Sequence, residues 1–197
     1  MSQNLDQLLA LIGEAILAID SSGVPYKSSK PPFREYQTGV GPYSETTLCK
    51  RIAQHLIDHH AAQFAGTKPQ RSPDLLIPNF WAIELKIARP FGDNGKEAEH
   101  WSQNLLHPYP GNTSALSDAM KLQTWKGRET PVVVVVGYEH HKPQIALDPL
   151  IDSFEAIGRD VLKLPIGPRF SRRLDDLCHP CHQVARLWAW EIFRSTS

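Results

Sequence analysis

The sequence predicts an α/β protein in which a mixed central sheet is flanked by helices. Three patterns support this fold class. Apolar residues recur at helical spacing between residues 5 and 19, side-chain character alternates from Trp81 to Ala88, and valine occupies every position from Val132 to Val136. Helices have a period of 3.6 residues and strands a period of two, so both kinds of element are expected. A chain of 197 residues suits one domain with a substantial core.

The first helix is predicted to begin at Asn4 or Asp6, either of which can cap it. Its apolar face consists of Leu5, Leu8, Leu9, Ile12, Ala15, Ile16 and Ile19. Residues 21–43 then form a long connection rich in Ser, Pro and Gly, and such connections are often functional. Its basic and aromatic side chains suit phosphates and stacked bases, with a solvated loop as the alternative: Tyr26, Lys27, Lys30, Arg34 and Tyr36.

A second helix is predicted from a cap at Ser44 to about His60. Its apolar face consists of Leu48, Cys49, Ile52, Ala53, Leu56 and Ile57. Glu45 projects from the same side as this apolar face, where a carboxylate needs a reason. One reason is the helix dipole, which favours negative charge at a helix N-terminus.

A tight β-hairpin is predicted over residues 73–86. On its second strand the odd positions are apolar, whereas the even positions carry Glu84 and Lys86 between alanines. Asp74, near the start of the first strand, then lies beside Glu84. Mg²⁺ prefers carboxylate oxygens, and bound Mg²⁺ activates water and neutralises phosphate charge. The alternative is an exposed ion pair on a solvated strand, with Asp74 as a turn residue.

These residues resemble the PD-(D/E)xK motif of the restriction-endonuclease-like nuclease superfamily. The resemblance implies that Asp74 and Glu84 bind the cation and that Lys86 positions the phosphate and the attacking water. It also gives Glu45 a second interpretation as a further metal ligand, because this superfamily often places a glutamate on the helix before the hairpin. Asp74, Glu84 and Lys86 are therefore the predicted catalytic residues, and Asp74, Glu84 and Glu45 are the predicted metal ligands.

The resemblance covers residues 44–138 as the core of a single nuclease-like domain spanning 1–197. Segments 1–43 and 139–197 are then elaborations that add helices at both ends. One departure concerns the stretch between the second helix and the hairpin, where that superfamily's core has its first strand. No convincing strand is predicted there, so the strand is either very short or supplied elsewhere.

After the hairpin, helices are predicted over residues 96–106 and from a cap at Ser114. On the latter helix, Asp118 and Lys121 are expected to form a surface ion pair. The resemblance implies that Lys121 and Gln123 face the site. In the last third, helices are predicted near 149–161 and up to about Phe193, the final one with an apolar stripe of Val184, Leu187, Trp188 and Ile192.

Basic and metal-binding residue types also occur in the last third. An arginine group suits the DNA backbone but equally suits a solvated patch with nearby acids: Arg169, Arg172 and Arg173. Cys178 and Cys181 belong to a CHPCH stretch that fits haem attachment or zinc ligation, but burial on the final helix is the favoured interpretation. His55 and His59 lack the glutamate of a zinc-protease helix and are expected at the helix surface or half-buried.

Composition sets broader limits. Basic and acidic residues are balanced at 21 each, which gives no overall attraction to DNA. The sequence has no apolar run long enough for a membrane span and no basic leader, and its three cysteines suit a reducing cytoplasm. It also has no phosphate-binding Gly-Lys loop and no serine-hydrolase elbow, so nucleotide and serine hydrolysis are not supported.

The sequence therefore predicts a cytoplasmic endodeoxyribonuclease that uses Mg²⁺, or Mn²⁺ in its place, to hydrolyse DNA. Restriction or another defence role is the expected setting, with repair as the alternative, and a homodimer is the expected assembly for cutting both strands. The main alternative is a catalytically inactive DNA- or protein-binding module on the same fold. A zinc-stabilised structural protein is a third hypothesis.

Overall fold

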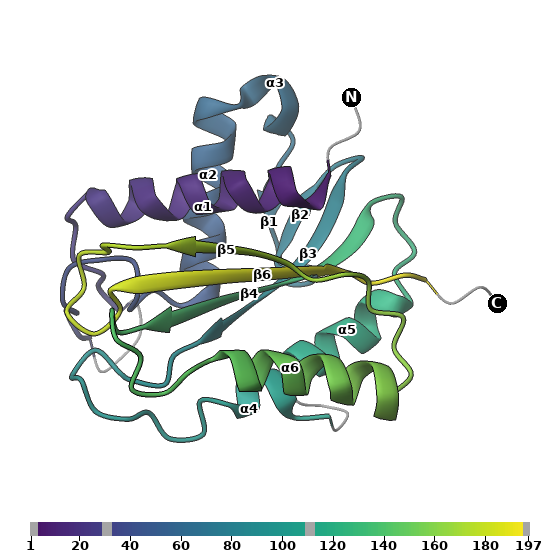
Figure 1. Ribbon diagram of the computed structural model, residues 1–197. Helices are drawn as coiled ribbons and strands as arrows, with labels where there is room; N and C mark the ends of the chain where they lie inside the picture. Colours follow the sequence, from purple (N-terminus) through teal and green to yellow (C-terminus); the bar gives the residue numbers. More distant parts are fainter. Residues whose placement is uncertain (1–3, 29–32, 109–112, 195–197) are drawn as a thin grey trace.

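The computed structural model describes residues 4–28, 33–108 and 113–194 of a mixed α/β protein (Figure 1). Its central six-stranded sheet has the strand order β1-β2-β3-β4-β6-β5. Strands β3 and β4 are parallel, and the other neighbouring strands are antiparallel. The strands are β1 (Lys68–Pro69), β2 (Leu75–Ile77), β3 (Trp81–Ala88), β4 (Thr130–Glu139), β5 (Phe170–Leu174) and β6 (Val184–Glu191). A mixed sheet flanked by helices is therefore confirmed.

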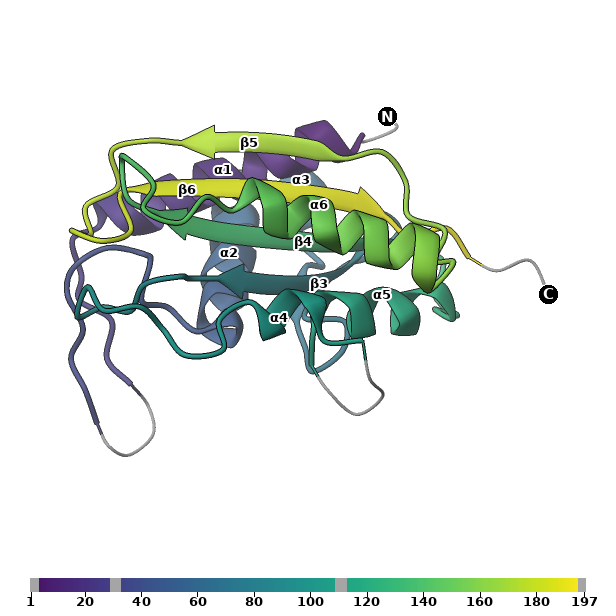
Figure 2. The ribbon, with the colours of Figure 1, turned by 60° about the horizontal axis from the view of Figure 1, so that its bottom comes forward.

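Helices cover both faces of the sheet, as Figure 2 shows from a second direction. One face carries α1 (Leu5–Ser21), α2 (Glu45–His59) and the single turn α3 (Ala61–Phe64). The other face carries α4 (Gln103–Leu106), α5 (Ala115–Gln123) and α6 (Asp148–Ala156), which continues into the π-helical turn η1 (Ile157–Val161). Each layer of helices encloses its own hydrophobic core against the sheet. The odd side chains of β3 pack towards α1 and α2, as their alternation predicts.

Side-chain caps fix the start of helices α1, α2 and α5. Asn4 accepts a hydrogen bond from the Gln7 N–H at 2.8 Å, so Asn4 rather than Asp6 is the first cap. Ser44 accepts from the Thr47 N–H, and Ser114 accepts from the Ser117 N–H. These oxygens satisfy backbone donors that lack a partner within the helix.

A strand does lie between the second helix and the hairpin, but it is only two residues long. It pairs antiparallel with β2 through Lys68 and Pro69. Proline has no N–H to donate to a ladder, which limits the length of this edge strand. The first of the two options predicted for this segment, a very short strand, is the one observed.

Two predicted helices are wrong. Over residues 96–106 only the turn α4 is helical, because the preceding residues bond back across the loop, as in the Ala98 N–H to Pro90 O bond of 2.8 Å. The predicted final helix is strand β6, which lies between β4 and β5. Apart from the half-buried Arg186 and Glu191, its side chains are apolar and buried on both faces, and such an apolar run does not distinguish a strand from a buried helix. Segment 139–197 therefore builds part of the sheet rather than only adding helices around it.

In the described segments no helix has both the length and the apolar character needed to cross a membrane.

Candidate active site on strand β3

The open edge of β3 holds two of the predicted ligands in place. Strand β2 pairs with β3 only as far as Ile83, so the next N–H groups on that side have no strand partner. Asp74 Oδ2 accepts from the Leu85 N–H at 2.9 Å, and Glu45 Oε1 accepts from the Ile87 N–H at 3.1 Å. Each carboxylate therefore uses one oxygen to cap the edge of the sheet and keeps the other for different partners.

The even side chains of β3 point to the opposite face, towards α5. Glu84 is 4 % exposed and Lys86 is 6 % exposed. Lys86 Nζ lies 3.4 Å from Glu45 Oε2 and 2.9 Å from Asp118 Oδ2. The Asp118 Oδ2 contact is an ion pair by distance, but its angles do not meet those of a hydrogen bond. Ser72 Oγ donates to Glu84 Oε1 at 2.8 Å.

Burial and neighbouring charges set the protonation of the cluster. Burial and the charges of Asp118 and Asp74 raise the pKa of Glu84 to about 8, against the hydrogen bond from Ser72. Burial acts to lower the pKa of Lys86, but the charges of Glu45 and Asp118 outweigh it and hold this pKa above its usual value. At neutral pH Glu84 is therefore mostly protonated and Lys86 is an ammonium ion.

The charges of the cluster leave room for a cation. Burial also raises the pKa of Glu45, although the Lys86 charge acts against that shift. Four carboxyl groups gather here, and the two ammonium groups paired with them, Lys86 and Lys121, balance half of their full charge. A divalent cation would balance the remainder once every carboxyl group is ionised.

The structure brings all the predicted site residues into one cluster and adds one. Asp118 was expected in a surface ion pair with Lys121, and that pair is present at 2.7 Å. Asp118 itself, however, is only 1 % exposed and also contacts Lys86, so the surface position is wrong. The sequence carried a signal for this burial, because Asp118 lies three residues after Ala115 and four before Leu122, both of which are buried.

The carboxylates are not yet arranged as a metal shell. Among the described residues, one group has three ligand atoms within 4.8 Å of one another, and it consists of Glu14, His55 and His60. Coordination of one ion by Asp74, Glu84 and Glu45 therefore requires their side chains to move. The approach to them is from the open edge of β3, where the Glu45 side chain is 32 % exposed.

The connection before α2 lies near the C-terminal end of β3. Tyr26 stacks on Tyr36 with ring centroids 5.2 Å apart, and Lys27 pairs with Glu35 at 3.2 Å. Lys30 lies outside the described residues. Beside this segment is a hollow of about 300 Å³ whose lining includes Tyr36, Ile87, Arg89, Phe91 and Trp101.

The arginine group of the last third lies at the opposite edge of the sheet. Strand β5, which carries Arg172 and Arg173, is three strand spacings from β3, or about 14 Å. Arg172 pairs with Asp6 at 3.0 Å, and Arg173 pairs with Asp175 at 2.8 Å. These pairs match a solvated patch better than a DNA contact.

The cysteines occupy a loop before β6 rather than a helix. Cys178 is exposed and Cys181 is half-buried, so the predicted burial on a helical stripe is wrong. The neighbouring histidines join this loop to the loop after β3: His179 Nε2 lies 3.0 Å from Asp93 Oδ1, and His182 Nε2 lies 2.8 Å from Phe91 O. These two rings are stacked and almost fully buried. They are not arranged around the cysteine sulfurs as zinc ligands.

The fold and the cluster define a mixed α/β protein with a buried acid–lysine group at an open strand of its sheet. No family model, no curated protein and no solved structure matches this chain. Its function is therefore inferred from its residues and their geometry.

Proposed function

We propose that this protein is a Mg²⁺-dependent endodeoxyribonuclease of the PD-(D/E)xK type, with a restriction-endonuclease-like core. The observation that carries the proposal is the convergence of Asp74, Glu84, Lys86 and Glu45 at one strand. Segments far apart in the sequence supply them, and their oxygens suit a hard divalent cation. Restriction or another defence role is the proposed setting, with a homodimer cutting the two strands.

In this proposal Asp74 and Glu84 bind the ion, and Glu45 is a further ligand. The ion supplies charge neutralisation at the phosphate and a more acidic bound water. Lys86 acts as a fixed ammonium ion, because its pKa is held above the usual value and it does not release a proton at neutral pH. It holds the scissile phosphate and stabilises the charge that develops on it.

Glu84 couples metal binding to pH. Its pKa of about 8 means that a proton occupies this carboxyl group at neutral pH. Coordination of a divalent cation by Glu84 would displace that proton and offset the cost of a buried carboxylate. With the acids balanced in this way, the Lys86 ammonium would be free to turn from Asp118 towards a phosphate.

DNA approaches from the open edge of β3. Lys68 on β1 and Arg71 in the connection to β2 are exposed, and Arg71 precedes Ser72, which contacts Glu84. Phe33, on the connection near the C-terminal end of β3, is 75 % exposed. Exposed cations suit phosphates and an exposed aromatic ring suits a base, so these positions are the proposed DNA contacts.

Plasmid cleavage tests the proposal. Wild-type protein is expected to nick or linearise supercoiled DNA with Mg²⁺ and to do nothing with EDTA. Lys86→Ala and Glu84→Gln are expected to be inactive, and Arg172→Ala, at the far edge of the sheet, is the matched active control. Thermal melts of each variant verify folding. Equal cleavage by folded wild-type and Lys86→Ala protein contradicts the proposed mechanism.

A second candidate is a catalytically inactive module that binds DNA or protein on the same fold. Two observations favour it. Lys86 pairs with Asp118, and the oxygens of Asp74, Glu84 and Glu45 do not lie close enough together to share one ion. Titration calorimetry with Mg²⁺ or Mn²⁺ distinguishes the two, because a nuclease must bind the ion and this binding must be lost when Asp74 is replaced. An inactive module binds DNA without doing so.

A further inference from the structure

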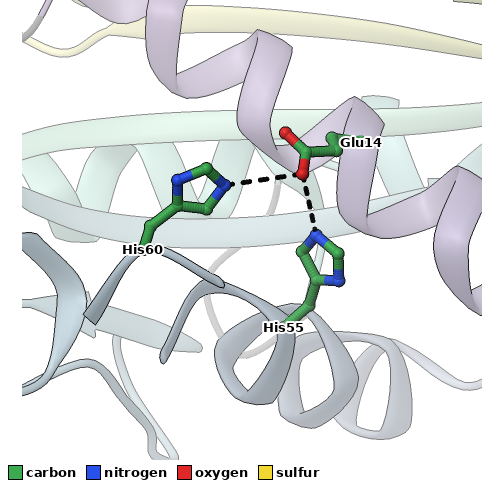
Figure 3. Close-up of side chains that lie close together, drawn as sticks. All are labelled: Glu14, His55 and His60. Atoms are coloured by element: carbon green, nitrogen blue, oxygen red, sulfur yellow. Dashed lines mark hydrogen bonds and ion pairs between the residues drawn. The ribbon is translucent and has the colours of Figure 1, made fainter. Parts of the chain in front are cut away.

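A second cluster joins α1 to the far end of α2, away from the proposed nuclease site. Glu14 lies on α1, His55 lies on α2 and His60 is the C-cap residue that follows α2 (Figure 3). Both histidines direct Nε2 at the same oxygen: Glu14 Oε1 is 3.3 Å from His55 Nε2 and 3.5 Å from His60 Nε2.

The His55 contact is a long hydrogen bond and the His60 contact is at ion-pair distance, and both distances also suit a metal site. A charge-assisted N–H···O bond is about 2.7–2.9 Å long, so both contacts are long for such bonds. Zinc bonds to nitrogen and oxygen of about 2.0–2.1 Å give a tetrahedron whose ligand atoms are about 3.3 Å apart. The two observed separations, 3.3 and 3.5 Å, match that edge.

Burial of the ring nitrogens adds an independent observation. His60 Nε2 is shielded from solvent and has no hydrogen-bond partner in the described part of the chain. The His55 side chain is only 10 % exposed, and its ring stacks on His59 with centroids 4.2 Å apart. A buried imidazole nitrogen without a hydrogen bond is costly, and coordination of a cation would satisfy it.

An ion can reach this cluster from solvent. Surface hollows of about 330 and 400 Å³ extend to His55 and His60 respectively. Glu14, with a side chain 50 % exposed, leaves one side open for a water molecule. The cluster also lies at the C-terminal end of α2, where the helix dipole favours positive charge.

We propose that Glu14, His55 and His60 bind a divalent transition metal of the zinc class, with water as the fourth ligand. Two imidazoles and one carboxylate suit Zn²⁺ or Co²⁺ and do not suit Mg²⁺, which prefers oxygen ligands. The ion holds α1 against the junction of α2 and α3. This site is independent of the proposed nuclease function.

Titration of the metal-stripped, full-length protein tests the site. Co²⁺ is expected to bind with the visible absorption of a tetrahedral complex, and one equivalent of Zn²⁺ is expected to displace it in the presence of excess Mg²⁺. Zinc is also expected to raise the melting temperature. Glu14→Gln and His60→Gln are each expected to weaken zinc affinity at least tenfold and to remove most of the thermal shift.

The matched control is His59→Gln, because His59 is a neighbouring histidine that is exposed and lies outside the ligand set. Its zinc affinity is expected to stay within twofold of wild type. Glu84→Gln is expected to retain zinc binding, which separates this site from the nuclease site. Absence of uptake, or an equal loss in His59→Gln and His60→Gln, overturns the proposal. Circular dichroism confirms that each variant is folded.

Discussion

The two ends of helix α2 carry side-chain clusters of different ligand types. Its first residue, Glu45, joins a buried cluster of carboxylates and a lysine, whereas His55, ten residues later, joins a half-exposed cluster of two imidazoles and one carboxylate. At 1.5 Å per residue, about 15 Å of helix separates them. A single helix thus carries one candidate site for a hard cation and one for a zinc-class metal.

The difference between the two ends follows from what surrounds each of them. At the N-terminal end, the free N–H groups of β3 and the Lys86 ammonium hold carboxylates that would otherwise repel one another. At the C-terminal end, the last backbone carbonyls have no partner within the helix and carry partial negative charge. A histidine or a cation is favoured there. Ligand type, rather than the number of acids, therefore decides which ion each end prefers.

The largest expected difference between the ends is in DNA cleavage. Glu84→Gln removes a proposed Mg²⁺ ligand, and loss of several kcal/mol of transition-state stabilisation corresponds to a rate decrease of about 10²-fold or more. Glu14→Gln, in the other cluster, is expected to cleave within twofold of wild type. Initial rates of plasmid nicking at saturating Mg²⁺ measure both. Similar losses in the two variants would mean that the clusters are not separate in function.

Stability gives the next largest difference. Lys86→Met leaves Glu45 without its cation and leaves Asp118 with Lys121 alone, and breaking a buried pair in this way typically costs about 3–5 kcal/mol. Lys27→Met removes an exposed pair and is expected to cost less than about 1 kcal/mol. Urea unfolding at pH 7 measures both free energies.

A double variant sharpens the stability comparison. Adding Asp118→Asn to Lys86→Met removes one of the two carboxylate charges that Lys86 balanced, so part of the lost stability is expected to return. If Lys86→Met is no less stable than Lys27→Met, the buried ion pair does not contribute as proposed.

The pH dependence comes third. Metal binding displaces the proton of Glu84, so Mg²⁺ affinity is expected to rise about tenfold per pH unit up to about pH 8 and then level off. Without metal, the raised pKa has the opposite effect. The protonated Glu84 carboxyl group stabilises the folded state fully below pH 4.5, the pKa of glutamate in the unfolded chain. This stabilisation is lost as the pH rises through about 8, the pKa in the folded state.

Calorimetry with Mg²⁺ at pH 6, 7 and 8 measures this dependence on wild-type protein and on Glu84→Gln. The variant cannot release the proton and is expected to show a flat profile. A wild-type affinity that is equally flat would exclude displacement of a proton from Glu84.

The smallest effect concerns DNA binding. Arg71→Ala, next to the site, is expected to flatten the dependence of log K on log salt by about 0.9 for each phosphate that the protein no longer neutralises. Arg172→Ala, whose side chain pairs with Asp6 at the far edge, is expected to leave the slope unchanged. Fluorescence anisotropy with labelled duplex DNA across a salt series measures both. The reverse result would move the DNA path to β5.

Sequence patterns correctly predicted the features that depend only on neighbouring residues. The caps at Ser44 and Ser114 and the two faces of β3 follow from neighbouring residues alone. Strand β6 was missed because its residues are apolar at nearly every position, which hides the period of two when both faces are buried. Two predicted ligands, Asp74 and Glu45, do cap free N–H groups of β3, but only the fold shows which groups these are.

The unpredicted part of the site depends on packing between distant elements. Asp118 reaches Lys86 because α5 covers the even face of β3, which spacing along α5 alone does not reveal. Glu14 and His60 likewise meet because α1 lies across the end of α2. Sequence spacing showed that His55 was available, but it did not show which acid would face it.

Diffraction from crystals soaked in Mn²⁺ tests the central claim most directly, because the anomalous signal locates the ion. We expect a peak about 2 Å from oxygens of both Asp74 and Glu84, with Lys86 turned away from Asp118. A saturating soak that leaves this position without a peak, while Asp74 and Glu84 keep their present bonds to Leu85 and Ser72, would contradict it.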